Sequence, residues 1–196
     1  MNRWPPDREH ILKSVDVLRH GAVIAFPTDT LYAVAARAAD PRAVSRLYAV
    51  KRRPPTQPLV WLVSGPQAVD RFALVSEEAA GLMRRYWPGP LTLVLPALPA
   101  AGQPTLAVRA PEHPLALALL EALDEPLASS SANRAGAAPP IDADAVIAGL
   151  GDDLDLVLDG GPCRIGEPST ILDLTQPEPR ILRHGAIPAD QLIPAT

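Results

Sequence analysis

The chain of 196 residues carries 18 basic and 22 acidic residues, a formal net charge of −4, and 47% hydrophobic residues. This composition excludes a disordered or fibrous chain and argues against a general nucleic-acid-binding surface. The single cysteine, Cys163, excludes an internal disulfide and a multi-cysteine metal site. We expect one domain, residues 1–196, with a core over about residues 8–187 and a short tail, 188–196.

Helices and strands are predicted to alternate along the chain. Apolar residues at helical spacing predict helices over 11–18, 41–51, 76–86, 113–123 and 143–147. Short apolar runs predict strands over 22–26, 59–63, 91–95, 105–109, 156–158, 170–174 and 180–183. Another strand is expected to begin at Leu127 and to pass at Ser129 into a polar turn. The alternation indicates an α/β fold, and the closely spaced late strands indicate a mixed sheet.

Four polar segments stand near the ends of predicted strands or helices, where open α/β sheets bind ligands. These segments are 27–30 (Pro-Thr-Asp-Thr), 51–55 (Lys-Arg-Arg-Pro-Pro), 129–133 (Ser-Ser-Ser-Ala-Asn), and 168–170 (Pro-Ser-Thr) with 183–185 (Arg-His-Gly). Each also has a purely structural interpretation, as a turn, a helix terminus or a cap. Taken singly, none of them identifies a function.

The basic residues of these segments can converge on one ligand. Helical spacing places Lys51 and Arg52 about 100° apart, whereas Pro54 disfavours helical geometry at Arg53 and lets it turn towards Lys51. Lys51, Arg53, Arg109 and Arg183 are then four candidate cations in an acidic chain. The pattern predicts a site for a small phosphorylated ligand.

Several other site classes are not indicated. The chain has no phosphate-binding loop of the Walker type and no dinucleotide fingerprint. Its four histidines lack metal-ligand spacing, and the serine run lacks the glycines of a nucleophile elbow. No apolar run has the length of a membrane span, and the N-terminus lacks a signal-peptide core. We expect a cytoplasmic protein with no membrane association.

Taken together, the segments resemble the YrdC-like family of threonylcarbamoyl-AMP synthases, also called TsaC, in its single-domain form. The matching segments, in family order, are 26–30, 51–54 with 58–59, 87–92, 108–111 with 113–114, 131–133, 169–171, and 182–183 with 185. The most specific part is the lysine-x-arginine motif at Lys51 and Arg53, together with the serine-x-asparagine motif at Ser131 and Asn133.

The resemblance implies an open, twisted mixed sheet flanked by helices around a concave central cavity. It also implies a nucleotidyltransferase that forms threonylcarbamoyl-AMP and pyrophosphate from L-threonine, bicarbonate or CO2, and ATP. The product would pass to a separate tRNA threonylcarbamoyltransferase complex, with at most a weak contact between this chain and tRNA. Mg²⁺ is expected through the ATP phosphates, with no metal ligand from protein side chains.

The resemblance assigns residues to three roles. The catalytic residues would be Lys51, Arg53, Ser131 and Asn133. Those that bind ATP would be Lys51, Arg53, Gln57, Thr105, Ser129, Asn133, Pro139 and Arg183. Those that bind threonine would be Thr30, Arg109, Ser131 and Ser169, with Arg109 pairing the carboxylate.

Three departures from the family pattern bear on the threonine side. Tyr32-Ala33-Val34-Ala35 replaces a frequent Tyr-Gly-x-Gly, and since alanine disfavours positive φ we expect a tighter or altered loop there. Arg134-Ala135-Gly136 replaces x-Ser-Gly, and Trp61-Leu62 stands where some members have a histidine. Two alternatives therefore stay open: a diverged paralogue with another carbamoyl acceptor, and an RNA-binding module without synthase activity.

Overall fold

A mixed sheet of ten strands runs through the computed structural model, which describes residues 2–193. The strands are β1 (Asn2–Trp4), β2 (Ile24–Pro27), β3 (Tyr32–Arg37), β4 (Val60–Leu62), β5 (Leu91–Pro96), β6 (Thr105–Arg109), β7 (Leu127–Ser131), β8 (Leu156–Leu158), β9 (Thr170–Asp173) and β10 (Arg180–Arg183). Their order in the sheet is β1-β8-β2-β3-β7-β4-β6-β5-β9-β10. Parallel and antiparallel pairs alternate irregularly, so the predicted mixed α/β sheet is confirmed.

Five α-helices cover the sheet. They are α1 (Arg8–Arg19), α2 (Pro41–Lys51), α3 (Glu77–Tyr86), α4 (Pro114–Leu123) and α5 (Ala143–Leu150), joined by short 3₁₀ turns at Pro66–Arg71, Pro99–Ala101, Gly151–Asp153 and Ala189–Gln191. The predicted start of α2 is confirmed: Asp40 accepts hydrogen bonds from the first-turn amides, and Pro41 occupies the first helical position. None of the helices in the described part of the chain is long and apolar enough to cross a membrane.

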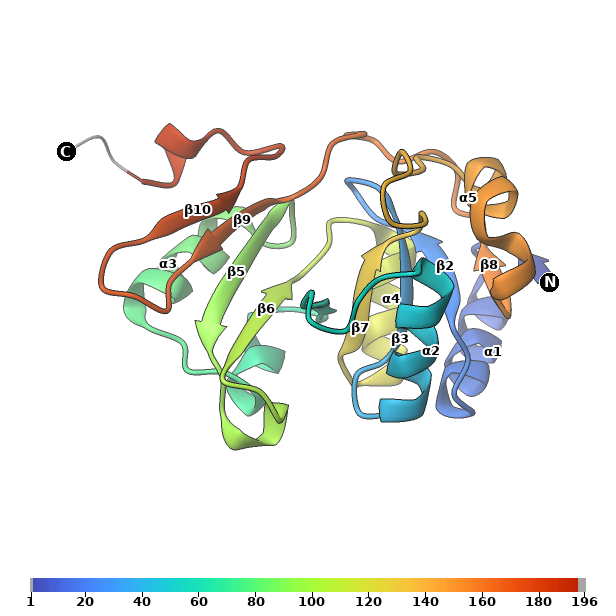
Figure 1. Cartoon of the computed structure of the whole chain (residues 1–196), viewed down its shortest axis with the longest axis horizontal. Helices are drawn as coiled ribbons and strands as arrows, with labels where there is room; N and C mark the ends of the chain where they lie inside the picture. The colour runs from blue at the N-terminus through green and yellow to red at the C-terminus, as the bar shows by residue number, and fades with distance from the viewer. Residues whose placement is uncertain (1, 194–196) are drawn as a thin grey trace.

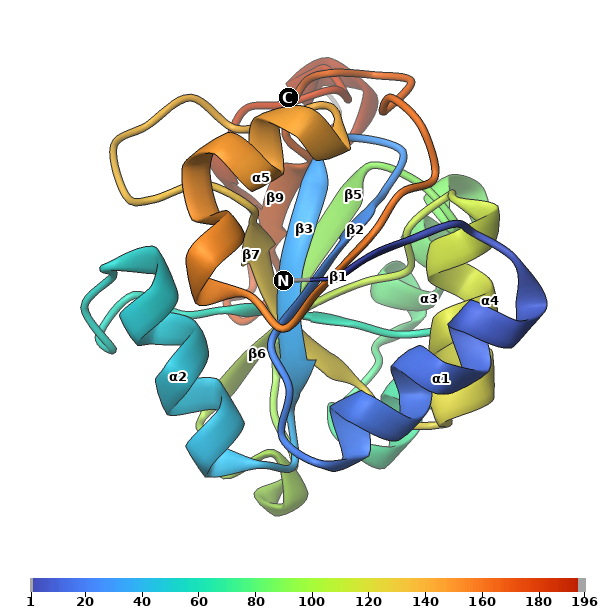
Figure 2. The ribbon, with the colours of Figure 1, turned by 90° about the vertical axis from the view of Figure 1, so that its right-hand side faces the viewer.

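Three clusters of buried residues divide the core. One lies between the sheet and helices α1 and α4, and the second lies on the opposite face under α2 and α5 (Figure 2). The third packs α3 against β5, β6 and β9. The sheet thus has two halves: one lies between the first two clusters, and the other, with β5, β6 and β9, packs against α3. Figure 1 shows the two halves side by side, and β4 joins them through a parallel pairing with β6 and an antiparallel pairing with β7. β4 therefore makes the two halves one continuous sheet.

The sequence missed β3 and β1 and ended β7 too early. β3 is buried on both faces and contains three alanines and only one β-branched residue, Val34, so it shows neither the polar alternation nor the run of β-branched residues that marks a strand. The serines 129–131 were expected in a turn, but all three pair with β3 inside the sheet, and Ser129 also pairs with β4. The expected altered loop at Ala33 and Ala35 was also wrong, because both alanines lie in β3. There they need no positive φ.

The segment expected as a C-terminal tail packs onto the domain as far as it is described. Leu192 is buried in the third cluster, and the Tyr86 hydroxyl donates a hydrogen bond to the Gln191 carbonyl at 3.0 Å. Residues 194–196 of that tail lie outside the described residues. That residues 1–196 form one domain stays a prediction.

Candidate active site

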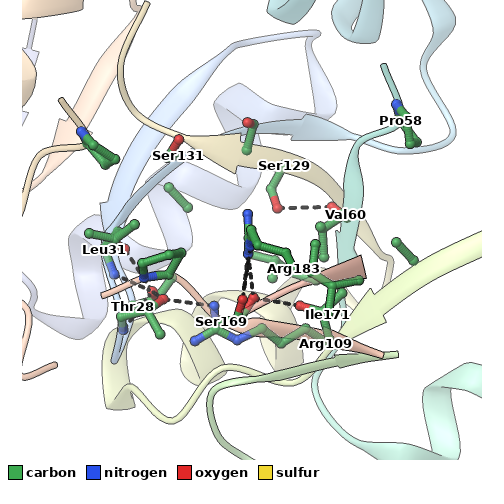
Figure 3. A pocket seen from close by; sticks show the side chains of 18 of the residues that line it. Thr28, Leu31, Pro58, Val60, Arg109, Ser129, Ser131, Ser169, Ile171 and Arg183 are labelled. Carbon is green, nitrogen blue, oxygen red and sulfur yellow. Dashed lines mark hydrogen bonds between the residues drawn. The ribbon is translucent and has the colours of Figure 1, made fainter. Parts of the chain in front are cut away.

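The hollow between the two halves of the sheet holds a cavity of about 380 Å³. Residues from β3, β4, β5, β6, β7, β9 and β10 line it, and Figure 3 shows several of them converging on its centre. The cavity thus lies between the two halves of the sheet, at the polar ends of their strands.

Strand register builds the floor of the cavity. Ala107 pairs with Val60 on one side and Val94 on the other, which makes an apolar row across β4, β6 and β5. Two residues further along β6, Arg109 pairs with Leu62. Since alternate residues of a strand share a face, Ala107 and Arg109 both face the cavity. The floor is therefore apolar, with a cation at one end.

Arg109 is fixed by three hydrogen bonds. Its Nε donates to the Gly89 carbonyl at 3.0 Å, its Nη1 to Thr30 Oγ1 at 2.8 Å, and its Nη2 to Asp29 Oδ1 at 2.5 Å. Burial lowers the pKa of Arg109, and the negative charge of Asp29 opposes that effect. Two of the five N–H groups of the guanidinium remain for a ligand.

A second cation and two hydroxyls lie beside Arg109. The Arg183 side chain reaches from β10 to Ser169, where Nε and Nη2 donate to its carbonyl at 3.0 and 2.8 Å and Nη2 donates to Oγ at 2.9 Å (Figure 3). Ser169 Oγ is also 2.8 Å from Thr92 Oγ1. Burial, followed by the charges of Arg109 and Arg53, lowers the pKa of Arg183. The cavity therefore holds an excess of positive charge that an anion would neutralise.

Arg53 provides the cation at the opposite end. Its Nη1 donates to Ser130 Oγ and its Nη2 to the Pro58 carbonyl, both at 2.9 Å, while its Nε is buried without a partner. Arg52 has a left-handed conformation at φ 51° and is exposed, so it faces away from this group. As predicted from the spacing, Lys51 and Arg53 both reach towards β7.

Lys51 lies behind the cavity wall. The residue is 2% exposed, and its Nζ donates hydrogen bonds to the carbonyls of Ser131 and Asn133. Burial, and then the charge of Arg53, lowers the pKa of Lys51 to about 8. Asn133 also braces this turn, because its Nδ2 donates to the carbonyls of Arg134 and Ala137 at 3.0 and 2.8 Å. Its Oδ1 is buried with no partner.

Most of the residues singled out from the sequence meet at this cavity. Those that line it are Thr30, Arg53, Arg109, Ser129, Ser131, Pro139, Ser169 and Arg183. Lys51 and Asn133 stand directly behind it, as described above. Gln57 and Thr105 are exposed and do not line it, although Thr105 shares its strand face with Ala107.

Two residues that contribute to the site were not singled out. Asp29 was part of a polar segment, but nothing in the sequence indicated that its carboxylate would meet Arg109, 80 positions away. Ser130 was passed over in favour of its neighbours, yet it is the serine that accepts from Arg53. In both cases a long-range pairing decides the role.

The cavity has no built-in metal site. Across residues 2–193 there is no group of three or more histidine, cysteine or acidic side chains that could hold an ion. Asp29 Oδ1 is paired with Arg109, and the oxygens of the site that are buried without a partner are Asp29 Oδ2, whose negative charge Arg109 already neutralises, and the neutral Asn133 Oδ1. Because Mg²⁺ sites use carboxylates or substrate phosphates, these residues do not fit a resident Mg²⁺ ion.

Comparisons with known proteins agree with this geometry. A family model, Sua5/YciO/YrdC (telomere recombination), matches residues 16–185. A threonylcarbamoyl-AMP synthase of Pyrococcus abyssi is 40% identical over 182 residues, covering 89% of this chain and 54% of that protein. One of Bacillus subtilis is 39% identical over 190 residues, covering 93% of this chain and 55% of that protein.

A solved structure shares the fold closely. The crystal structure of P. abyssi Sua5 complexed with L-threonine has a TM-score of 0.91 and 36% identity, covering 98% of this chain and 60% of that one. The chain thus spans a little over half the length of these relatives.

Proposed function

Because the chain belongs to the Sua5/YciO/YrdC family, we propose that it is a nucleotidyltransferase, an L-threonylcarbamoyladenylate synthase. It would convert L-threonine, bicarbonate or CO2, and ATP into threonylcarbamoyl-AMP and pyrophosphate. The observation that carries the proposal is the cavity itself. It places Arg109 with two free N–H groups at one end and Arg53 among the β7 serines at the other, above an apolar floor.

The proposed reaction suits a cavity of this kind. The ammonium group of threonine first releases a proton, and the neutral amine then combines with bicarbonate to form a carbamate with loss of water. A carbamate oxygen then attacks the α-phosphorus of ATP, and pyrophosphate leaves. Since the reactants provide their own nucleophile, the protein has only to position them and to neutralise charge.

The phosphates would lie at the Arg53 end. Arg53 supplies charge-assisted donors, Arg183 adds positive charge from its place beside Arg109, and Ser129 lines the cavity near them. Lys51 adds positive charge from behind and, with Asn133, holds the carbonyls of the turn that follows β7. The nucleoside would extend past Pro139 at the rim, towards Gln57 and Thr105.

Threonine would lie at the Arg109 end. Its carboxylate pairs with the two N–H groups of Arg109 that the protein leaves free, and Thr30, Ser131 and Ser169 surround the rest of the molecule. Asp29 positions the guanidinium for that pairing.

The remaining partners follow from the reaction. Mg²⁺ would enter as part of the substrate, bound to the ATP phosphates, because the cavity itself does not fit a resident ion. The product would go to a tRNA threonylcarbamoyltransferase complex, with only a weak contact between this chain and tRNA. We place the reaction in the cytoplasm, where ATP and the tRNA acceptor occur.

Pyrophosphate release tests the proposal. We expect release from ATP to require both threonine and bicarbonate, each omitted in turn. Arg53→Ala should abolish most of it, whereas Arg52→Ala, which removes the adjacent but exposed arginine, should leave it unchanged. Equal release without threonine would contradict the assigned substrate. Bicarbonate-dependent release with a different amino acid only would indicate the diverged paralogue, for which Leu62 beside Arg109 is the first residue to test.

A further inference from the structure

The connection from β8 to β9 crosses from one half of the sheet to the other, as Figure 1 shows. We call its first part, residues 159–166, the backing loop, because it packs against the segment 27–30 without lining the cavity itself. The segment 27–30 carries two of the residues that hold Arg109. The contacts of the backing loop therefore bear on the geometry of the site from outside it.

Two backbone amides of the backing loop hold the residues that direct Arg109. The Ile165 amide donates to the Asp29 carbonyl at 2.9 Å, and the next amide, of Gly166, donates to the Thr30 carbonyl at 3.0 Å. The side chains of Asp29 and Thr30 accept the two Nη hydrogen bonds of Arg109. Since Asp29 and Thr30 are 1% and 2% exposed, their carbonyls depend on protein donors rather than on water.

Asp159 fixes the first turn of the backing loop. Its Oδ1 accepts from the Gly161 amide at 3.0 Å, which forms an Asx turn, and the Tyr32 hydroxyl donates to the Gly161 carbonyl at 2.9 Å. Gly161 has a φ of +81°, a conformation that favours glycine. Gly160 has no room for a side chain, because an added Cβ would stand 2.7 Å from Pro27 Cγ. The turn therefore lies directly against Pro27.

The N-terminal strand β1 holds Asp159 in its turn. Arg3 Nε and Nη2 donate to Asp159 Oδ2 at 3.0 and 2.6 Å, and the Asp159 amide donates to the Trp4 carbonyl at 2.8 Å. Arg3 Nη1 donates separately to Asp144 at 2.7 Å, and the side chain of Asp144 is 80% exposed. Arg3 thus has two carboxylate partners, of which only Asp159 belongs to the backing loop.

We propose that Asp159 is a positioning residue for the Arg109 end of the cavity. It joins the N-terminal strand to the backing loop, and the loop holds the carbonyls of Asp29 and Thr30 while their side chains direct the guanidinium. Asp159 itself does not line the cavity. The effect on threonine binding rests on the proposed function, whereas the effect on the two carbonyls does not.

Amide hydrogen exchange, followed residue by residue by NMR, tests the link from Asp159 to the two carbonyls. Asp159→Ala should speed exchange at Ile165 and Gly166 by roughly tenfold, because the loop loses a hydrogen bond to a charged group. The Leu174 amide, which donates to the Val94 carbonyl in the other half of the sheet, should exchange at the wild-type rate.

Two variants serve as controls for that measurement. Asp144→Ala takes a carboxylate from Arg3 without touching the backing loop, so the amides of residues 165 and 166 should keep their wild-type exchange rates. Asp159→Asn keeps an oxygen for the Gly161 amide and should restore most of the protection. Should Asp159→Ala fail to fold, Arg3→Gln at its half-exposed position should give a milder acceleration, of about threefold.

Kinetics test the link from the backing loop to Arg109. Asp159→Ala should raise the KM for threonine by roughly threefold to tenfold, because the guanidinium that receives the carboxylate is held less firmly. The KM for ATP and kcat should stay unchanged, since the phosphates lie at the Arg53 end. Asp144→Ala should alter none of the three values.

The outcomes separate the steps of the proposal. Unchanged exchange at residues 165 and 166, or equal acceleration at Leu174, would overturn it, because the first shows no dependence on Asp159 and the second a general loss of stability. Faster exchange with an unaltered KM for threonine would overturn the link to Arg109. A wild type that releases no pyrophosphate would refute the proposed function, and the exchange rates would still decide whether Asp159 positions the loop.

Discussion

Asp29 and Arg109 form an ion pair sealed from solvent, in which Oδ1 lies 2.5 Å from Nη2 and the side chains are 0% and 7% exposed. The same carboxylate oxygen accepts from the Glu112 amide at 3.0 Å, and the Asp29 carbonyl accepts from the Ile165 amide at 2.9 Å. Asp29 therefore connects three chain segments to the guanidinium. The direction of the free Arg109 N–H groups, and with it the amino-acid end of the cavity, depends on this pair.

Removing Asp29 should destabilise the protein strongly. Asp29→Ala leaves Arg109 buried without its counter-charge, and breaking such a pair costs about 3–5 kcal/mol. The matched control is Glu112→Ala, which breaks the exposed ion pair with Arg164 and should cost no more than about 1 kcal/mol. Denaturant unfolding of both variants measures the difference. Similar losses for the two would show that burial of the Asp29–Arg109 pair has no energetic consequence.

Replacing Arg183 should affect the amino-acid end more than overall stability. Its guanidinium reaches the Ser169 carbonyl and hydroxyl at once, and the single ammonium of lysine cannot reproduce that fork. Arg183→Lys should raise the KM for threonine by roughly tenfold. Arg180→Lys, at an exposed position of the same strand, should leave it unchanged. An unaltered KM in Arg183→Lys would mean that Ser169 needs no support from β10.

The sequence predicted the helices, most strands and the convergence of the cations, because these depend on local residue spacing and on start signals such as the helix N-cap at Asp40-Pro41. It could not predict β3 or the serine half of β7. A strand rich in alanine or serine becomes recognisable only once its neighbours in the sheet are known. Asp29 was missed for the same reason, since its partner is distant in sequence.

The direction of Lys51 also lay beyond the sequence. Spacing predicts that Lys51 shares a side with Arg53, and it does. The spacing does not predict that Lys51 Nζ donates its hydrogen bonds to the carbonyls of Ser131 and Asn133, behind the cavity wall. That outcome depends on where β7 ends and on how the next turn folds back.

Two glycines with open space around them should respond oppositely to alanine. Gly149 lies within α5 with no heavy atom within 4 Å of an added Cβ, so Gly149→Ala should stabilise the protein by about 0.5–1 kcal/mol. Gly102 has equally open surroundings but a φ of +66°, so Gly102→Ala should destabilise it by about 1 kcal/mol. Unfolding free energies measure both. A stabilised Gly102→Ala would contradict the left-handed turn after β5.

The lowered pKa of Lys51 should make ATP binding depend on pH. Burial and the charge of Arg53 bring this pKa to about 8, so Lys51 is a cation below that pH and neutral above it. As its positive charge is lost, the affinity for ATP should fall by about threefold to tenfold between pH 7 and pH 9. Lys51→Arg keeps its charge over that range and should give a flat profile. ATP binding measured without threonine and bicarbonate keeps the titration of the amino-acid amine out of the comparison. A flat wild-type profile, or an equal decline in Lys51→Arg, would show that the charge of Lys51 does not act on the phosphates.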